Sequence, residues 1–377
     1  MNSNYPLVPY EPPSWASRLT FIPKHRIQFA NRNTPIQRWH LPGIPEDFQV
    51  LLKRDDMTGS VLSGNKIRKL EFLLADAVET GCEVIMTCGG VRSNHCRATA
   101  IASRQIGLDC HLFLWSRTRD LQGQFTGNTL LDRMVGSNFY LVPHECSFQT
   151  EILPRMTQLQ EHIKDTSGKK SYAIPLGGSN SVGVWGYIDC FQELVSQGLL
   201  EKVTDVVVAL GSSGTVTGLA IGNFLTGNNL KIHGMAVLGD AAYFHFEADQ
   251  ILRDLGLQAS DGSSGVKAAD IMDIVEGAKG IGYGLSTPEE LECIQEIAMT
   301  TGILTDPCYT GKAAFHTMRL MREDPGRFKG KKILFIHTGG WFDLFSGVMS
   351  SAVDGKTSAE NKVADWMELT DKVPVVQ

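Results

Sequence analysis

Short apolar runs that end in glycine alternate along this chain with segments in which apolar residues recur every three or four positions. In the segment SGNKIRKLEFLLADA (63–77) the apolar side chains return at helical spacing, and Gly81 follows as a stop signal. The next run, CEVIMTC (82–88), is β-branched and apolar, and it ends in two glycines. This alternation of helix and buried strand predicts an α/β protein with parallel strands.

The order of the elements predicts two sheets. After a helix that begins at a good N-cap, Ser93, the first series has strands at 109–115 and 138–142 and helices at 127–136 and 150–165, the last interrupted or kinked at Pro154. The second series has strands at 171–176, 205–210, 231–237 and 331–340 and a charged helix near 288–301. The predicted fold class is therefore α/β, with two open, mostly parallel sheets flanked by helices.

Four glycine-rich turns follow predicted strands, namely CGGVRSN, LGGSN, LGSSGT and HTGG. In open parallel sheets, ligands bind beyond the carboxyl ends of the strands, where glycine turns let backbone N–H groups approach an anion. The turn GSSGT (211–215) matches neither a Walker loop nor the dinucleotide fingerprint. Its hydroxyls and amides would surround one phosphate monoester, with Lys69 as countercharge. A plain turn followed by a helix N-cap is the alternative.

Three cations, Lys66, Arg68 and Lys69, stand in the first turn of the helix that follows Ser63. A helix N-terminus already carries partial positive charge, so these side chains oppose the helix dipole unless an anion neutralises them. The alternative is that the long side chains extend into water. A bound anion would explain both the cationic first turn of this helix and the turn GSSGT.

The composition of the chain argues against several classes of binding partner. The 377 residues, 42% of them hydrophobic, suffice for two domains, and 35 basic against 41 acidic residues give a net charge of -6, which argues against nucleic acid. Eight scattered cysteines without a C-x-x-C pair indicate neither a metal site nor a disulfide framework. Without a signal-peptide pattern or an apolar run of ~20 residues, we expect a cytoplasmic protein that does not enter membranes.

Seven motifs occur in a fixed order: SGNKIRKLEFLLADA, CGGVRSNHCRATA, LGGSNSVGVWGY, LGSSGTVTGL, GIGYGLST, DPCYTGKAA and FIHTGG. Together they resemble the D-cysteine desulfhydrase and 1-aminocyclopropane-1-carboxylate deaminase family, pyridoxal 5'-phosphate enzymes of fold type II (tryptophan synthase β-like). The resemblance implies an active site between a large cofactor-binding domain (1–68 and 178–353) and a small inserted α/β domain (69–177). It also implies a homodimer. The polar segment that begins with DGKTSAENK (354–362) predicts a polar C-terminal tail at 354–377.

The resemblance assigns the cofactor contacts. Lys66 would hold C4′ of pyridoxal phosphate covalently, and a lysine in a desolvated cleft is the kind whose amine is neutral and nucleophilic. Lys69 would face the phosphate. The remaining cofactor contacts that the resemblance implies are Asn94 at the ring oxygen, Ser212, Ser213, Gly214 and Thr215 around the phosphate, Tyr309 on the ring, and Thr338 near the ring nitrogen.

The substrate contacts implied by the resemblance are Ser93, Asn94 and His95, with the serine and asparagine at the substrate carboxylate. Ser93 would serve as a helix N-cap as well. Of the two tyrosines, Tyr283 and Tyr309, one would stand at the reacting carbon and the other against the cofactor ring. Buried tyrosines usually fill core space, but both of these lie in glycine-bounded loops.

The chain departs from the family pattern in three places. Arg92 stands where glutamine is common, Ser213 replaces a glycine of the phosphate loop, and WFDLF, which begins at Trp341, follows HTGG where smaller residues are usual. A guanidinium directed into the pocket would favour an anionic substrate side chain, whereas one directed into solvent would not. These positions therefore bear on the size and charge of the pocket.

The predicted activity is a lyase that eliminates hydrogen sulfide from D-cysteine to give pyruvate and ammonia. The alternatives within the family are ring opening of aminocyclopropane carboxylate and elimination from another β-substituted amino acid, such as serine or cysteate. Thr310 and Thr338 stand where the deaminase branch has glutamate and leucine, so a weaker electron sink, suited to a thiolate leaving group, is expected. A non-catalytic binding protein and a dehydrogenase are the alternatives from other classes, but the reactive groups are intact and the dinucleotide fingerprint is missing.

Overall fold

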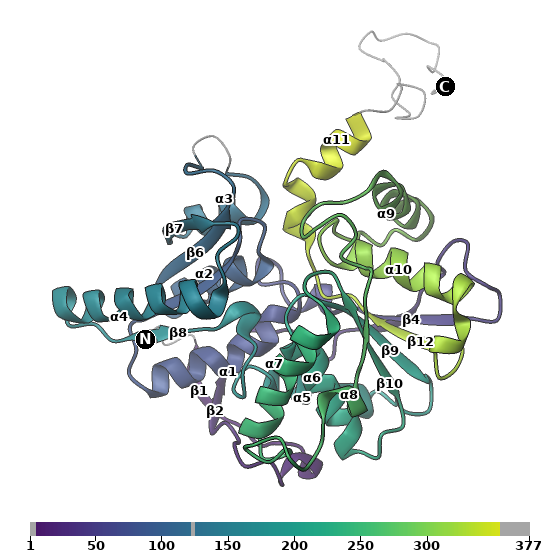
Figure 1. The fold of residues 1–377 in the computed structure, drawn as a ribbon, viewed down its shortest axis with the longest axis horizontal. Helices are drawn as coiled ribbons and strands as arrows, with labels where there is room; N and C mark the ends of the chain where they lie inside the picture. The colour runs from purple at the N-terminus through teal and green to yellow at the C-terminus, as the bar shows by residue number, and fades with distance from the viewer. Residues whose placement is uncertain (1–4, 122–124, 355–377) are drawn as a thin grey trace, which may run out of the picture.

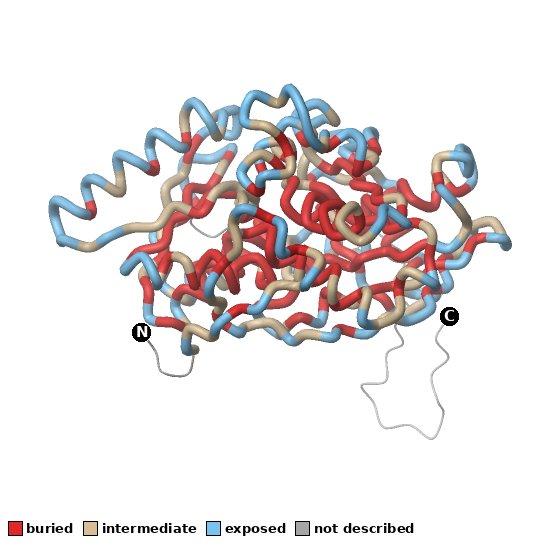
Figure 2. Tube along the Cα trace, turned by 90° about the horizontal axis from the view of Figure 1, so that it is seen from below, coloured by how far each residue is buried: buried red, intermediate tan, exposed pale blue. Residues whose placement is uncertain are grey.

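The computed structural model describes residues 5–121 and 125–354 (Figure 1). The described residues form two large, mostly parallel sheets and a separate two-stranded antiparallel pair. Helices flank both large sheets, so the predicted fold class is confirmed. The tail predicted at 354–377 lies outside the described residues, except for Asp354, the last residue of α11 (Val348–Asp354). Buried residues run through the middle of the molecule and exposed residues form its outer layer (Figure 2).

The smaller sheet has four parallel strands in the order β7-β6-β5-β8. Its strands are β5 (Val84–Gly90), β6 (Asp109–Ser116), β7 (Asn138–Pro143) and β8 (Ser171–Ala173). The helices of this half are α2 (Asn94–Gln105), α3 (Gly127–Met134) and α4 (Leu153–Ser167). All but one of the predicted strands in this half therefore belong to the sheet that the sequence analysis assigned to them.

The exception is the strand predicted at 171–176, which was grouped with the second sheet. That grouping is wrong, because β8 pairs in parallel with β5 and the Thr87 hydroxyl donates at 3.0 Å to Ile174 O just beyond it. The partner of a strand is chosen by tertiary packing, which its own short sequence does not encode. Pro154 stands in the first turn of α4, directly after a π-helical turn (Phe148–Ile152), so the helical segment changes its type close to the position where the sequence predicted an interruption or a kink.

The larger sheet has six strands in the order β11-β10-β9-β12-β4-β3, with β3 antiparallel and the other pairs parallel. Its strands are β3 (Ile36–Arg38), β4 (Gln49–Lys53), β9 (Asp205–Leu210), β10 (Lys231–Ala236), β11 (Asp273–Val275) and β12 (Lys332–Ile336). The helices of this half are α5 (Trp185–Ser196), α6 (Gly214–Leu225), α7 (Ala241–Asp254), α8 (Ala268–Ile271), α9 (Pro288–Thr301) and α10 (Thr310–Glu323).

Short elements complete the fold. They are the antiparallel pair β1 (Leu7–Pro9) and β2 (His25–Ile27) and the 3-10 turns η1 (Ser14–Ala16), η2 (Asp55–Met57), η4 (Leu176–Gly178), η5 (Pro325–Arg327) and η6 (Trp341–Phe345). The sequence analysis predicted none of β1 to β4 or β11. Strands of three residues, such as β3 and β11, are too short to display an alternating pattern.

Helix α1 (Asn65–Glu79) packs against α2 of the smaller half and α5 of the larger half (Figure 1). Its predicted apolar face lies in a buried cluster that includes Ile67, Leu70 and Leu74. The contact with α5 is close, because a Cβ at Gly186 would lie 2.5 Å from the carbonyl oxygen of Arg68. Helix α1 therefore forms the link between the two halves of the molecule.

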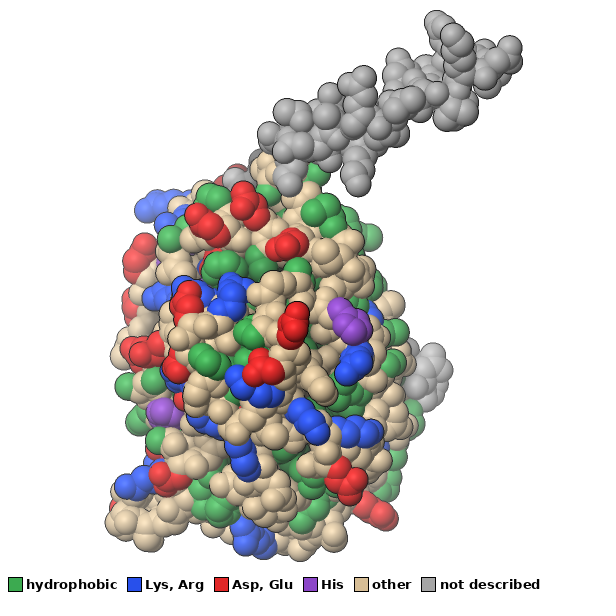
Figure 3. Space-filling view, turned by 90° about the vertical axis from the view of Figure 1, so that its right-hand side faces the viewer, with side chains coloured by type: hydrophobic (Ala, Val, Ile, Leu, Met, Phe, Trp, Pro, Cys, Tyr) green, Lys and Arg blue, Asp and Glu red, His purple; other side chains and the backbone are tan. Residues whose placement is uncertain are grey.

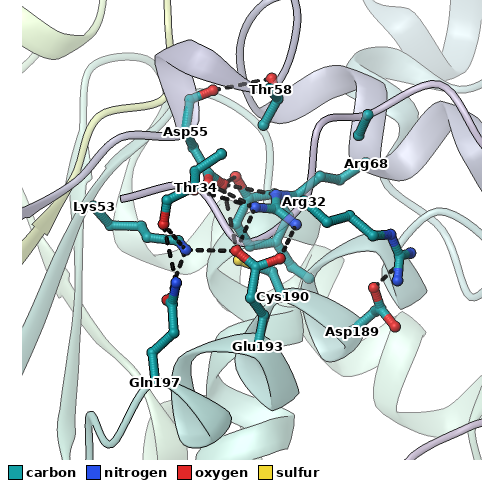
Figure 4. Close-up of polar contacts among 12 residues, drawn as sticks. Arg32, Thr34, Lys53, Asp55, Thr58, Arg68, Asp189, Cys190, Glu193 and Gln197 are labelled. Atoms are coloured by element: carbon teal, nitrogen blue, oxygen red, sulfur yellow. Dashed lines mark hydrogen bonds and ion pairs between the residues drawn. The ribbon is translucent and has the colours of Figure 1, made fainter. Parts of the chain in front are cut away.

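Arg68, one of the three cations at the start of α1, lies in a buried ionic network (Figure 4). Its guanidinium donates to both carboxylate oxygens of Asp55 at 2.8 and 2.9 Å and to both of Glu193 at 3.0 Å. Glu193 also accepts a hydrogen bond from Lys53, while Tyr187 donates to Asp55 at 2.7 Å. Burial raises the pKa of Asp55, but the charge of Arg68 outweighs it and holds that pKa below its usual value. The network joins β4, η2, α1 and α5.

The surface carries both signs of charge. Lysine and arginine side chains are interspersed with acidic ones on the face drawn in Figure 3, so that face has no extended basic stripe for a polyanion. None of the helices within residues 5–121 and 125–354 combines the length and apolarity needed to cross a membrane.

Replacing Arg68 with leucine leaves the carboxylates of Asp55 and Glu193 buried without their main partner. We expect Arg68→Leu to lower the free energy of unfolding by about 3–5 kcal/mol, measured by urea denaturation. The matched control is Arg104→Leu, because the Arg104–Asp109 pair is solvent-exposed, with 44% and 38% of the side chains accessible, and is worth about 0.2–1 kcal/mol. Equal losses in the two variants would contradict a structural role for the network.

Candidate active site

A pocket opens where the carboxyl ends of strands from both sheets face α1. It is lined by Asn65, Lys66, Asn94, Ala209, Gly211, Ser212, Tyr309, Thr338 and Gly339. Asn94 follows β5 of the smaller sheet, whereas Gly211 and Thr338 follow β9 and β12 of the larger one. Five of the predicted site residues, Lys66, Asn94, Ser212, Tyr309 and Thr338, therefore line one pocket.

Lys66 lies in the first turn of α1 and is half-buried. Its Nζ stands 3.4 Å from the Ser212 hydroxyl, and burial lowers the pKa of Lys66 to about 8. Gly64, which precedes the helix at φ 104°, fits only because it lacks a side chain, since a Cβ there would lie 2.6 Å from Thr338 O. The backbone thus holds Lys66 at the pocket, and burial gives it an amine that loses its proton unusually easily.

Lys69 is fully buried and has no carboxylate partner among the described residues. Its Nζ donates to Gly177 O at 3.1 Å and to the Ser179 hydroxyl at 3.3 Å. Burial, and after it the neighbouring Lys66, holds the pKa of Lys69 well below its usual range. A buried ammonium group that has only neutral partners is a site prepared for an anion.

The start of α6 completes the surroundings of Lys69. A Cβ at Gly214 would lie only 3.1 Å from Lys69 Nζ, and Gly214 N–H donates to Ser179 Oγ at 3.1 Å. The Ser213 hydroxyl is buried without a hydrogen-bond partner, and Thr215 accepts from Asn65 at 3.0 Å. A helix N-terminus, an unpartnered hydroxyl and a buried lysine fit a phosphate group.

The sequence analysis missed Ser179 and Asn65 as members of this cradle. Ser179 stands in LGGSN, one of the four glycine turns that the sequence analysis singled out, so a signal was present. Asn65 directly precedes Lys66 and showed no such signal. Its amide reaches Thr215, which is 150 positions away in the sequence.

The turn after β5 holds Ser93, Asn94 and His95 in buried positions. Ser93 is the predicted N-cap, because its hydroxyl accepts from Cys96 N–H at 3.1 Å. Asn128, which the sequence analysis did not single out, donates from Nδ2 to Asn94 Oδ1 at 3.0 Å. The Asn94 oxygen is thereby occupied, and its Nδ2 donors remain for the pocket that this residue lines.

The hydrogen bonds of His95 fix its tautomer. The Thr87 hydroxyl donates its proton to Ile174 O, so it can only accept from His95 Nε2, which lies 2.8 Å away. Nδ1 therefore carries a lone pair, and it is buried without a partner. Burial, together with the charges of Lys66 and Lys69, holds the pKa of His95 well below its usual value, so the ring is neutral.

Tyr283 and Tyr309 meet directly. Their hydroxyl oxygens are 2.7 Å apart and their ring planes are inclined at 70°. Glycines make room for both rings, since a Cβ at Gly90 would lie 2.9 Å from Tyr283 and a Cβ at Gly211 would lie 2.8 Å from Tyr309. Burial holds the pKa of both hydroxyls well above the usual range, so each keeps its proton.

Thr310 and Thr338, on which the expected choice of substrate depends, lie in different surroundings. Thr338 lines the pocket, and its carbonyl accepts from Asn65 N–H at 3.1 Å. Thr310 is not among the residues that line the pocket, and its hydroxyl donates to Asp306 Oδ1 at 2.6 Å at the start of α10. Both positions present a neutral hydroxyl group.

Arg92 adopts neither orientation considered from the sequence. Its guanidinium binds both carboxylate oxygens of Asp343, at 2.6 and 2.5 Å, and it also donates to Gly284 O. Because the charge of Arg92 is paired with that of Asp343, the pocket gains no free cation from it. Trp341 is 41% exposed, so it does not fill the pocket.

Asp306, Cys308 and Asp343 form a buried group whose ligand-type atoms lie within 4.8 Å of one another. The Asp306 carboxylate, however, accepts from the N–H groups of Cys308 and Thr310 at 2.9 and 2.8 Å, and Asp343 is bound by Arg92. Burial keeps the pKa of the Cys308 thiol well above its usual value, so it stays protonated. We therefore assign no metal to this group.

Taken together, the half-buried Lys66 with its lowered pKa and the groups around Lys69 at the carboxyl ends of the strands fit a pyridoxal-phosphate site. The chain belongs to the family of pyridoxal-phosphate-dependent enzymes, whose model matches residues 27–339. Pyridoxal phosphate is accordingly its cofactor, and the residues around Lys66 and Lys69 fit that group.

Individual relatives within this family have more specific names. The chain is 43% identical to a "Bifunctional D-cysteine desulfhydrase/1-aminocyclopropane-1-carboxylate deaminase, mitochondrial" of Arabidopsis thaliana, over 97% of this chain and 89% of the relative. It is 32% identical to a "D-cysteine desulfhydrase" of Klebsiella pneumoniae, over 85% of this chain and 95% of that one. A solved "ACC deaminase homologue" superimposes with a TM-score of 0.76 at 32% identity, covering 91% of this chain and 99% of the other.

The lowered pKa of Lys66 makes a prediction about the cofactor-free protein. Since only the neutral amine reacts with acylating reagents, we expect labelling of Lys66 to rise through pH about 8 and then level off. An ordinary lysine becomes half neutral only near pH ~10.4. Competitive labelling followed by mass spectrometry measures the pH profile of Lys66 and, as an internal comparison, that of the exposed Lys24. Equal profiles for the two lysines would contradict a desolvated environment of Lys66.

Proposed function

We propose that the protein converts D-cysteine and water to pyruvate, ammonia and hydrogen sulfide. The observation that carries the proposal is the pocket in which Lys66, with its lowered pKa, faces Ser212, Tyr309 and the neutral Thr338. The names of the Arabidopsis and Klebsiella relatives, which both include D-cysteine desulfhydrase, support it.

Several residues would hold the cofactor. Lys66 would bond covalently to it, and Lys69 with the turn that starts α6 would bind its phosphate. The further contacts are those proposed from the family resemblance: Asn94 at the ring oxygen, Ser212, Ser213, Gly214 and Thr215 around the phosphate, Tyr309 against the ring, and Thr338 near the ring nitrogen. The buried, unpartnered hydroxyl of Ser213 and the free amide donors of Asn94 support two of these roles.

Pyridoxal phosphate, when bound, supplies the electron sink that stabilises negative charge at Cα of the substrate. The protein supplies the rest. Ser93 and Asn94 bind the substrate carboxylate at the start of α2. His95 is the third proposed substrate contact, and its neutral ring, whose bare Nδ1 can only accept a hydrogen bond, adds no charge to the pocket. Lys66 removes the Cα proton with its neutral amine, and Tyr283, whose hydroxyl keeps its proton, stands at the reacting carbon.

The second candidate activity is ring opening of aminocyclopropane carboxylate, which is favoured by the second half of the Arabidopsis relative's name. Opening an unactivated ring demands a stronger electron sink, and neither Thr310 nor Thr338 offers a carboxylate that would keep the ring nitrogen of the cofactor protonated. Elimination from cysteate is disfavoured because Arg92 is paired with Asp343. Serine, with a poorer leaving group than a thiol, is the remaining alternative.

We further propose that residues 69–177 form a small domain inserted between 1–68 and 178–353, and that two chains form a homodimer in the cytoplasm. The proposed domains are supported by strand membership, because β5 to β8 all fall within 69–177 and every strand of the larger sheet lies outside it. All eight cysteines are free, which is compatible with a reducing compartment.

Removing the ammonium group of Lys69 tests the phosphate site. We expect Lys69→Ala to weaken pyridoxal phosphate binding by about 1.5–3 kcal/mol, the value of one charge-assisted hydrogen bond, as measured from the dissociation constant of the reconstituted protein. Lys24→Ala, which removes an exposed lysine, is the control. An unchanged dissociation constant in Lys69→Ala would rule out the phosphate role.

Substrate choice tests the proposed reaction. With D-cysteine, L-cysteine, cysteate and aminocyclopropane carboxylate offered to one enzyme preparation, we expect pyruvate and sulfide from D-cysteine and little or no 2-oxobutyrate from the cyclopropane. Lys66→Ala serves as the inactive control for non-enzymatic breakdown. The proposal is wrong if cysteate or the cyclopropane reacts faster than D-cysteine.

A further inference from the structure

Arg92 joins three segments that are far apart in the sequence. It lies in the turn between β5 and α2, it pairs with Asp343 of η6, and it donates to the carbonyl oxygen of Gly284. Gly284 directly follows Tyr283. We infer that Arg92 is a positioning residue that holds Tyr283 at the reacting atoms, an inference that rests on the role proposed above for that tyrosine.

The bond to Asp343 is strong enough to serve as an anchor. The guanidinium meets the carboxylate through two parallel N–H to O contacts, at 2.6 and 2.5 Å, which is the fork geometry that only arginine can offer. The Asp343 side chain is fully buried, and the Arg92 side chain is only 17% exposed. Burial raises the pKa of Asp343 to about 6 even though Arg92 opposes it, so the carboxylate is charged at neutral pH.

The segment that carries Tyr283 is held at both of its ends. Before the tyrosine, the buried ammonium of Lys312 donates to Lys279 O at 2.8 Å and to Gly282 O at 3.2 Å. After it, Arg92 binds Gly284 O. The two sets of bonds come from the two halves of the molecule, one from α10 of the larger half and one from the turn that ends β5 in the smaller half.

The same turn also supports the ring of Tyr283. Gly90 lies so close beneath it that a Cβ there would be 2.9 Å from the ring. Arg92 O and Asn94 Oδ1 both accept from the amide of Asn128, each at 3.0 Å. One turn therefore holds the residues proposed to bind the substrate carboxylate and, through Arg92, the tyrosine proposed to stand at the reacting carbon. Glutamine, common here in the family, cannot form the charged fork with Asp343.

Kinetics of paired variants test the inference. We expect Arg92→Gln to lower kcat for D-cysteine about 10- to 100-fold with a smaller change in KM, because a displacement of about 1 Å at a reacting group has that effect. In a Tyr283→Phe background, the same substitution should cause little further loss, since the group to be positioned is gone. Arg104→Gln, which alters an exposed arginine of α2, is the control and should keep the wild-type kcat.

Arg92→Gln alone leaves the Asp343 carboxylate buried without its partner and risks misfolding. The double variant Arg92→Gln/Asp343→Asn removes both charges, so it should regain wild-type cofactor affinity and thermal midpoint while kcat stays low. Hydrogen exchange followed by mass spectrometry gives a readout independent of activity. The peptide 279–287 should exchange faster in this double variant than in the wild type or in Arg104→Gln.

The outcomes separate the two proposals. Wild-type kcat and exchange in Arg92→Gln/Asp343→Asn, with a low kcat in Tyr283→Phe, would overturn the inference about Arg92 alone. Losses that multiply fully in the Tyr283→Phe background would overturn it too, because Arg92 would then act by another route. A wild-type kcat in Tyr283→Phe would overturn the proposed role of the tyrosine and, with it, the need to position that residue.

Discussion

The forked bonds from Arg68 to Asp55 and Glu193 fix how α1 is turned about its own axis. Successive residues of a helix point about 100° apart, so a guanidinium tied to two buried carboxylates leaves the neighbouring side chains no choice of direction. Lys66 and Lys69, three positions apart, share one face of α1; Lys66 lines the pocket, and Lys69 donates to Gly177 O. The position of the reactive amine thus depends on an ion pair that never meets a ligand.

The basic side chains Lys66, Lys69 and His95, at and beside the pocket, have no carboxylate partner among the described residues. Lys69 has only neutral partners, Lys66 has a lowered pKa, and His95 is kept uncharged by the same surroundings. Basic groups that lie this close together repel one another when protonated, so burial and repulsion both favour their neutral forms. A phosphate dianion changes this balance, because it allows Lys69 to hold its full charge at low electrostatic cost.

Much of this arrangement could be predicted from the sequence, since strands, glycine turns and helix starts are local signals. The start of α2 at Ser93, the turn before α6 and the cationic first turn of α1 are examples. Long-range pairing could not be predicted from the sequence. The sheet to which β8 belongs was assigned wrongly, and the partner of Arg92, Asp343, lies 251 residues away. Asn128 was missed for the same reason, because an asparagine that orients another asparagine has no pattern of its own.

Lys69, buried without a carboxylate partner among the described residues, also makes the stability of the folded chain depend on a bound anion. Until an anion arrives, the folded chain bears the cost of burying an amine with only neutral partners, and the unfolded chain does not. A ligand that binds the native state alone shifts the balance toward it by an amount that grows with its concentration. If that anion is the cofactor phosphate, as proposed, a fall in cofactor concentration raises the fraction of chains that open and are exposed to degradation.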